Sequence, residues 1–244
     1  MSKMSEPRAD LSGHASEVRR VLVWDVPVRL FHWLMVASFA GAWLTGESES
    51  LRLLHVTLGY TMGALVAFRI VWGVMGTRYA RFSTFVRGPK AIVAYVRGIL
   101  RGQPEHHVGH NPLGALAVLA LLGLTLAVMA SGWFSYNDIA GKSLEEAHEV
   151  AAAVMLAIVG IHVAGVLFSS WLHRENLVGA MVTGTKPGLP EQGIRRPWRS
   201  VAVLMVAGIA GIWWQQWQGA PEGSGYAAIS AMVAGVGDHD RDDD

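Results

Sequence analysis

The sequence predicts an all-α integral membrane protein that crosses the bilayer five times. Hydrophobic residues make up 52% of its 244 residues, and charged residues make up only 16%, whereas roughly a quarter is typical of soluble proteins. The apolar residues gather into five runs that polar or charged loops separate. A hydrocarbon core of about 30 Å needs a helix of about 20 apolar residues, and each run is close to that length.

Polar connections of different lengths join the predicted spans along the chain. They cover residues 27–46, 51–75, 112–133, 144–172 and 200–217. The first and third open with Pro27 and Pro112, and proline suits the first turn of a helix. Between the second and third spans, the stretch PKAIVAYVRGIL predicts a short amphipathic helix on the inner membrane face.

The charges of the loops predict the orientation of the spans. Lysine and arginine are concentrated in the loops 76–111 and 173–199, whereas the loop TGESESLR is acidic and the loop FSYNDIAGKS is nearly neutral. Because basic loops stay in the cytoplasm, the loops 76–111 and 173–199 and the N-terminus are expected inside. The fifth span then places the acidic C-terminal tail outside.

Composition excludes several classes of function. The net charge of +1 offers no basic field for nucleic acid. The chain has no cysteine, which excludes disulfides, thiolate metal sites, iron–sulfur clusters and c-type haem attachment. Any metal must therefore be held by histidine, methionine or oxygen ligands. Residues 1–19 are polar and are predicted to be a disordered N-terminal segment, not a signal peptide.

Four of the ten histidines lie inside predicted spans, at two depths. The first span enters from inside, so His32 lies near the inner face. The second and fourth spans enter from outside, so His55 and His148 lie near the outer face. His162 follows His148 by fourteen residues, a rise of about 21 Å and nearly four full turns. It therefore lies near the inner face, on the same side of its helix.

This arrangement predicts two separate sites, each with two histidines from two helices. One metal ion cannot reach ligands about 21 Å apart. A haem iron needs two axial ligands, and a cleft between helices can supply them. Such an iron has no open position, which favours electron transfer over oxygen chemistry. The alternative for each histidine is an interhelical hydrogen bond.

The other histidines are predicted to be solvated surface residues. They are His14, His106, His107, His110, His173 and His239. Three arginines near the membrane ends are candidate partners for the anionic propionates of haem. Arg29 and Arg69 lie toward the inner side, and Arg52 lies three residues before His55. The alternative for all three arginines is that they extend to the membrane interface as helix-end arginines commonly do.

Four stretches of the chain resemble the prokaryotic cytochrome b561 family, which includes the b-type subunits of nickel–iron hydrogenases. The first stretch, VWDVPVRLFHWLMVASFAGAWLTG, has Arg29, His32, Trp33 and the closing Thr45-Gly46 where the family has them. The others are LLHVTLGYTMGALVAFRIVWGVMGTRYARF with His55, GHNPLGALAVLALL, and EEAHEVAAAVMLAIVGIHVAGVLFSSWLHRENLVGAMVTGTK with His148 and His162. The resemblance covers about residues 20–187.

The resemblance implies a four-helix transmembrane bundle that holds two haem b groups non-covalently. His32 and His162 would be the axial ligands of the inner haem, and His55 and His148 those of the outer haem. The C-terminal fifth transmembrane helix departs from the plain four-helix members. The implied organisation is a cytoplasmic N-terminus over 1–19, a dihaem domain over 20–187, a linker and extra helix over 188–217, and a periplasmic acidic tail over 218–244.

The resemblance also implies a function in a bacterial respiratory chain. Family members pass electrons between the quinone pool of the cytoplasmic (inner) membrane and a redox partner, often periplasmic. The partner here would be a c-type cytochrome or a hydrogenase-like enzyme, and no catalytic residue is predicted. A superoxide:quinone oxidoreductase is an alternative. A histidine-based transporter or proton relay is another, but the chain has no repeat and its histidines avoid the midplane.

Overall fold

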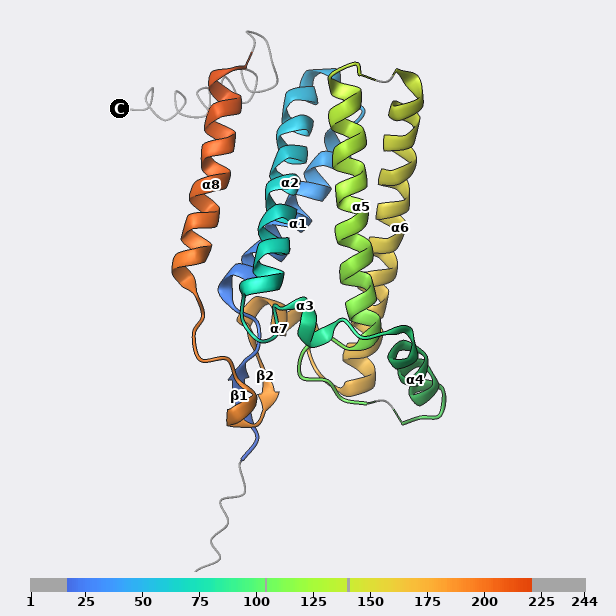
Figure 1. Ribbon diagram of the computed structural model, residues 1–244, viewed down its shortest axis with the longest axis vertical. Coiled ribbons are helices and arrows are strands. Elements are labelled where there is room, and N and C mark those ends of the chain that lie inside the picture. The colour runs from blue at the N-terminus through green and yellow to red at the C-terminus, as the bar shows by residue number, and fades with distance from the viewer. Residues whose placement is uncertain (1–16, 104, 140, 221–244) are drawn as a thin grey trace, which may run out of the picture.

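The computed structural model describes residues 17–103, 105–139 and 141–220, and in it long helices stand side by side with short elements at one end (Figure 1). The elements in chain order are β1 (Arg19–Leu22), α1 (Val26–Thr45), η1 (Glu49–Leu51), α2 (Arg52–Met75), α3 (Phe82–Phe85), α4 (Pro89–Leu100), α5 (Pro112–Tyr136), α6 (Lys142–His173), α7 (Leu177–Thr183), β2 (Thr185–Gly188), η2 (Pro190–Gln192) and α8 (Arg199–Gln218). Most of the predicted disordered N-terminus and acidic tail, with His14 and His239, lies outside the described residues.

The five long helices begin and end close to the predicted positions. Three of them, with bounds Glu49–Met75, Pro112–Tyr136 and Lys142–His173, are long and apolar enough to cross a membrane. Helices α1 and α8 have 20 residues each and fall outside that set. Polar residues such as Arg29 and His32 lower the hydropathy of α1. The membrane crossing of α1 and α8, and with it the five-span arrangement, stays a prediction.

Two helical hairpins form the bundle. Helix α1 packs on α2, α5 packs on α6, and the contact between α2 and α5 joins the hairpins. Helix α8 lies along α2 and α1, where the indole Nε1 of Trp213 donates a hydrogen bond to Thr61 Oγ1 over 3.0 Å. Helices α5 and α6 bury few of their apolar side chains within the chain, which is typical of helices that face lipid.

Capping residues set the start of two of these helices. The Asp25 carboxylate caps α1 by accepting a hydrogen bond from Val28 N over 2.8 Å, and Asn111 caps α5 by accepting from Gly114 N over 2.7 Å. Asp25 is fully buried and also accepts hydrogen bonds from Trp72 Nε1 and Thr77 Oγ1. This one side chain therefore fixes the start of α1 against the end of α2.

The lower end of the bundle in Figure 1 is closed by a compact cap that the sequence did not predict. Strands β1 and β2 pair antiparallel, with Arg19 opposite Gly188. The buried side chains of Val21, Val23 and Trp24 pack there with residues from the end of α2 and from α7. The strands have four residues each and come from opposite ends of the chain, so no local alternation pattern reveals them. They modify the all-α prediction only at this cap.

Candidate functional site

The rings of His55 on α2 and His148 on α6 lie close together at the upper end of the bundle, with their planes nearly perpendicular at 79°. Their centroids are 6.1 Å apart. The Nδ1 atom of His55 lies 2.8 Å from the Ala42 carbonyl oxygen, and that of His148 lies 2.9 Å from the Val128 carbonyl oxygen. A ring nitrogen that faces a carbonyl must donate its proton, so each Nε2 keeps a free lone pair.

This geometry fits two axial ligands of one haem iron. A metal–imidazole bond is about 2 Å long and the ring centre lies about 1 Å farther, so the centroids of two opposed ligands would be about 6 Å apart. The observed separation of 6.1 Å agrees. Within the described ranges, no three His, Asp or Glu side chains come together to hold a bare metal ion. Two imidazoles suffice for haem, because the porphyrin supplies the other four ligands.

Helix α5 packs closely against the His148 ring. A Cβ atom added at Gly132 would lie 2.8 Å from His148 Cε1 and 3.0 Å from its Nδ1. The hydroxyl of Ser131 lies 3.3 Å from the same Nδ1. The His148 ring can therefore take this position only because residue 132 has no side chain. Sequence reasoning missed Gly132 and Ser131, since small residues in a membrane helix are usually explained by helix packing alone.

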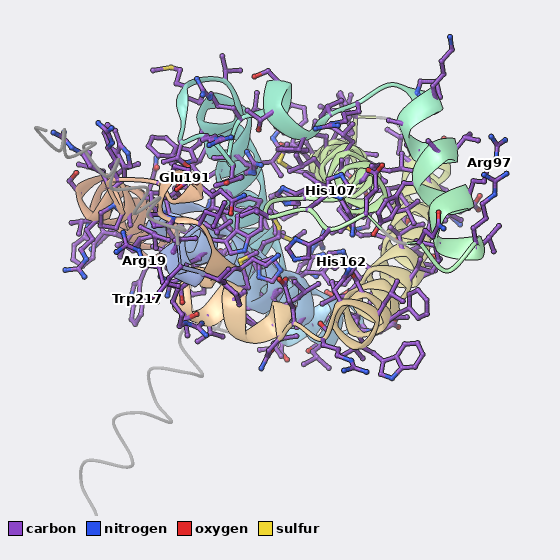
Figure 2. The ribbon with its side chains drawn as sticks, turned by 90° about the horizontal axis from the view of Figure 1, so that it is seen from below. Arg19, Arg97, His107, His162, Glu191 and Trp217 are labelled. Atoms are coloured by element: carbon purple, nitrogen blue, oxygen red, sulfur yellow. The ribbon has the colours of Figure 1, made fainter. Side chains whose placement is uncertain are left out.

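His32 on α1 and His162 on α6 are the second predicted pair, and both lie toward the cap end of their helices. His32 Nδ1 is buried and has no hydrogen-bond partner in the part of the chain that the structure describes. A buried nitrogen without a partner is costly, which fits a site that a group outside the chain completes. Figure 2 views the molecule from the cap end and shows His162 near the middle, away from Arg97 and Trp217 at the edges.

A third histidine lies beside this inner pair. His110, in the loop before α5, packs its ring against Trp24 at 4.7 Å and Phe85 at 4.5 Å between centroids. Burial, together with repulsion from the charges of Arg69, His162 and Lys186, lowers the pKa of His110 to about 3. Its Nδ1 is buried without a hydrogen-bond partner among the described residues. The prediction that His110 is a solvated surface residue is therefore wrong.

The three predicted arginines have different surroundings. Arg69 is buried at 3% exposure and donates from Nη1 to the Ala80 carbonyl, with its guanidinium 4.8 Å above the Phe82 ring. Its side chain therefore does not extend to the interface. Arg29 donates to the carbonyls of Met181 and Val182 at the end of α7. Arg52 is exposed and lies 5.5 Å from the Tyr136 ring centre. Arg69 is one of the charges that act on His110, Arg29 lies one helical turn before His32 on α1, and the pairing of all three arginines with propionates stays a prediction.

A buried ion pair fixes the loop that carries His110. Lys186 on β2 lies 2.8 Å from Glu175, and it also donates to the backbone carbonyls of His107 and Val108. His106 Nε2 lies 2.6 Å from the other oxygen of Glu175. Burial works against ionisation of Glu175, but the hydrogen bonds from Lys186 and His106 outweigh it and lower the pKa of this carboxyl. His106 itself is exposed, as predicted.

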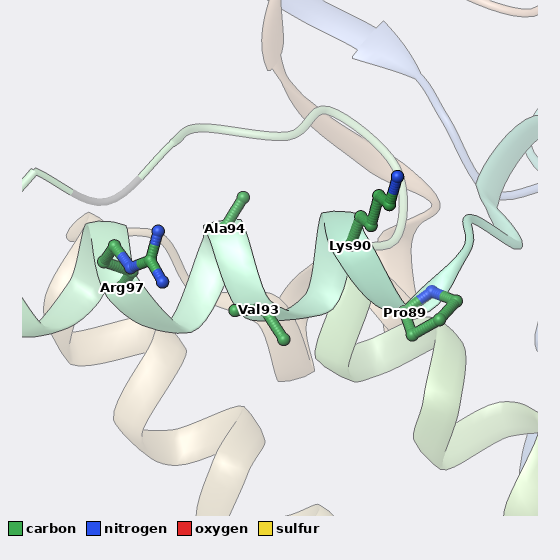
Figure 3. Close-up of a pocket in the computed structure, with 5 residues that line it drawn as sticks. All are labelled: Pro89, Lys90, Val93, Ala94 and Arg97. Carbon is green, nitrogen blue, oxygen red and sulfur yellow. The ribbon is translucent and has the colours of Figure 1, made fainter.

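One hollow of the described surface has no histidine in its lining. It is an open groove of about 380 Å³ on α4, lined by Pro89, Lys90, Val93, Ala94 and Arg97 (Figure 3). Helix α4 covers the range predicted for the amphipathic helix. No histidine lines this groove, so it is not part of either histidine site.

Comparisons with known proteins agree on one family. A family model described as prokaryotic cytochrome b561 matches residues 23–184, a range that contains both histidine pairs and His110. The chain is 23% identical to the probable Ni/Fe-hydrogenase B-type cytochrome subunit of Rhizobium leguminosarum bv. viciae, over 73% of this chain and 94% of that relative. No solved structure matches.

Further relatives carry the same description. The chain is 24% identical to the probable Ni/Fe-hydrogenase B-type cytochrome subunit of Rhodobacter capsulatus, over 67% of this chain and 80% of the relative. It is 25% identical to that of Azotobacter vinelandii, over 67% of this chain and 87% of the relative.

Proposed function

The chain belongs to the prokaryotic cytochrome b561 family, and on that basis we propose that it holds two haem b groups and carries electrons across a bacterial cytoplasmic membrane. His55 and His148 are the axial ligands of the outer haem, and His32 and His162 are those of the inner haem. The observation that carries the proposal is the outer pair, whose neighbouring rings both turn Nδ1 to a backbone carbonyl.

The chain's own residues hold and tune these groups. When bound, haem supplies an iron that gains and loses single electrons. The carbonyls of Ala42 and Val128 fix the tautomer and orientation of the outer histidines and raise their basicity as ligands. Two imidazoles on each haem iron would leave it no open position for a substrate. The sites therefore suit electron transfer and not oxygen chemistry.

The two sites lie at different depths, as a relay across the bilayer requires. His148 and His162 share α6 and are separated by about 21 Å along it. In the proposed orientation the basic loops, the cap and the N-terminus face the cytoplasm, and α1 and α8 complete five spans. The C-terminal tail is then periplasmic.

The electrons pass between the membrane quinone pool and a periplasmic redox protein. The relatives described as Ni/Fe-hydrogenase cytochrome subunits support a hydrogenase-like partner, and a c-type cytochrome is the other candidate. A histidine-based transporter is not favoured, because the four histidines gather in two pairs at two depths and not in one site at the midplane.

A difference spectrum tests the proposal. Membranes that contain the overproduced chain are oxidised and then reduced with dithionite, and the purified protein is assayed for haem. We expect a b-type spectrum and about two haems per chain, one for each histidine pair. A preparation that is folded but free of b-type haem would reject the proposal. Reduction of that haem by an added quinol would support the quinone step.

A further inference from the structure

His110 carries an unsatisfied hydrogen-bonding atom at the inner site. Trp24 and Phe85 enclose its ring, and its Nδ1 is buried without a partner in the described residues. Leaving such a nitrogen unpaired costs roughly 1–3 kcal/mol, so the chain gains nothing from this placement unless another molecule accepts the bond. The apolar enclosure also excludes water from two sides of the ring.

The charges around His110 favour an anion. Arg69, one of its charged neighbours, is buried and forms no ion pair within the described ranges. Asp25 attracts Arg69 electrostatically but forms no ion pair with it, because its carboxylate oxygens accept hydrogen bonds from Val28, Trp72 and Thr77 instead. A buried cation without a close counter-ion is stabilised by an anionic group from outside the chain.

The inner haem is the molecule that would bring such an anion to this place. His110 is close enough to His162 to interact with it electrostatically, and His162 is a proposed inner ligand. We propose that His110 is a cofactor-binding residue of the inner haem and donates a hydrogen bond from Nδ1 to a haem carboxylate that Arg69 also attracts. This inference rests on the proposed function, because it assumes that the inner site holds haem.

Two other roles for His110 fit less well. The iron has only two axial positions, and His32 and His162 on opposite hairpins fill them. A quinone oxygen could accept the same hydrogen bond, but a neutral quinone would bring no negative charge to within ion-pair distance of Arg69. The carboxylate satisfies both groups at once.

The loop holds His110 ready for this contact. Lys186 binds the carbonyls of His107 and Val108 just before it, and Asn111 just after it caps α5. A donor that is already fixed loses little conformational freedom when the cofactor binds. The hydrogen bond would neutralise part of the carboxylate charge and so raise the reduction potential of the inner haem.

Two substitutions separate a hydrogen-bond donor from a packing residue. His110→Phe keeps an aromatic ring between Trp24 and Phe85 but has no donor. His110→Asn keeps a donor close to the position of Nδ1 but loses the ring packing. His107→Phe is the matched control, because His107 lies in the same loop and its ring contacts Tyr95 instead. His32→Ala should remove the inner haem, and the reduction potential that disappears with it is then assigned to the inner haem.

The measurement is a redox titration of both haems in the purified holoprotein. We expect His110→Phe to lower the inner potential by about 59 mV, which is a tenfold change for a one-electron couple, and to leave the outer potential unchanged. His110→Asn and His107→Phe should stay near wild type. His110→Leu, which also lacks a donor, replaces His110→Phe if that variant does not accumulate.

Three results would overturn the inference. They are an inner potential that His110→Phe leaves unchanged, an effect of His110→Asn that exceeds that of His110→Phe, and a change of the inner iron from low spin to high spin in His110→Phe. The second result would mean that His110 acts through ring packing. The third would mean that His110 is an axial ligand of the iron. A wild-type protein without haem would instead refute the proposed function itself.

Discussion

Gly132 and His148 lie so close that a single methyl group at residue 132 would come within 2.8 Å of the His148 ring. The contact sets the distance between α5 and α6 at the outer site. It also holds the ring where its Nδ1 reaches the Val128 carbonyl. The position of His148 in the outer site therefore depends on the absence of a side chain at Gly132.

The substitution Gly132→Ala is expected to displace the His148 ring and weaken the outer haem site. Changes to groups that orient a metal ligand typically cost 10- to 100-fold in affinity. We expect haem content to fall from about two per chain toward about one when haem is limiting. The measurement is haem per chain in the purified protein.

Gly123→Ala is the matched control for this substitution. Gly123 lies on the same helix and has no atom within 4 Å of an added Cβ, so its variant should keep both haems. Equal haem loss in the two variants would mean that alanine in place of either glycine disturbs α5 as a whole, and would contradict a specific role for the contact between residue 132 and His148.

The inner pair can be tested by removal of one ligand. His162→Ala is expected to abolish the inner haem and spare the outer one, because the outer ligands on α2 and the start of α6 remain in place. Haem quantification and a redox titration should find one remaining haem with the potential of the outer haem. Loss of both haems to the same extent from a stably folded variant would argue against two independent sites.

Asp25 is expected to be a main stabilising residue of the cap. In Asp25→Asn one carboxylate oxygen becomes an amide group, which then faces a donor from Val28, Trp72 or Thr77. Loss of such a buried hydrogen bond costs about 1–3 kcal/mol. Chemical denaturation in detergent should show this loss in the free energy of unfolding. Glu105→Gln, at an exposed position, should change it by no more than about 0.5 kcal/mol.

Glu175 is expected to make the stability of the cap depend on acid pH. Its pKa is lowered on folding, so the unfolded chain binds more protons and stability falls as the pH falls. The contribution is complete above about pH 4.3, the ordinary value for glutamate, and is lost as the pH drops through the lowered pKa.

Thermal unfolding of Glu175→Gln at a series of acid pH values checks this dependence. The variant should be less stable than wild type near neutral pH and should lose less stability on acidification. Glu191→Gln, which removes an exposed carboxylate, serves as the control. A wild-type pH profile that coincides with that of Glu175→Gln would contradict the role of the Lys186–Glu175–His106 contacts.

The sequence predicted the long helices well because their causes are local. Apolar runs of membrane length, Pro27 and Pro112 at first turns, and basic loops at one end all act within a few residues of the helix ends. Helix periodicity likewise relates His148 to His162 along one helix. These features need no knowledge of which helix packs on which.

The cap could not be predicted because its contacts join distant segments. Arg19 pairs with Gly188, and His110 is partly buried because two aromatic rings pack on it and Lys186 holds its loop. Neither segment carries a strong local pattern. A histidine in a polar loop is usually exposed, and only the tertiary contacts reverse that expectation for His110.

The most direct test of the central claim is the haem content of His55→Ala, His148→Ala and the double variant. If both residues bind the same iron, each single variant and the double variant should all retain about one haem per chain, the inner one. If the two histidines served different haems, the double variant would lose both while each single variant kept one, and that result would contradict the account.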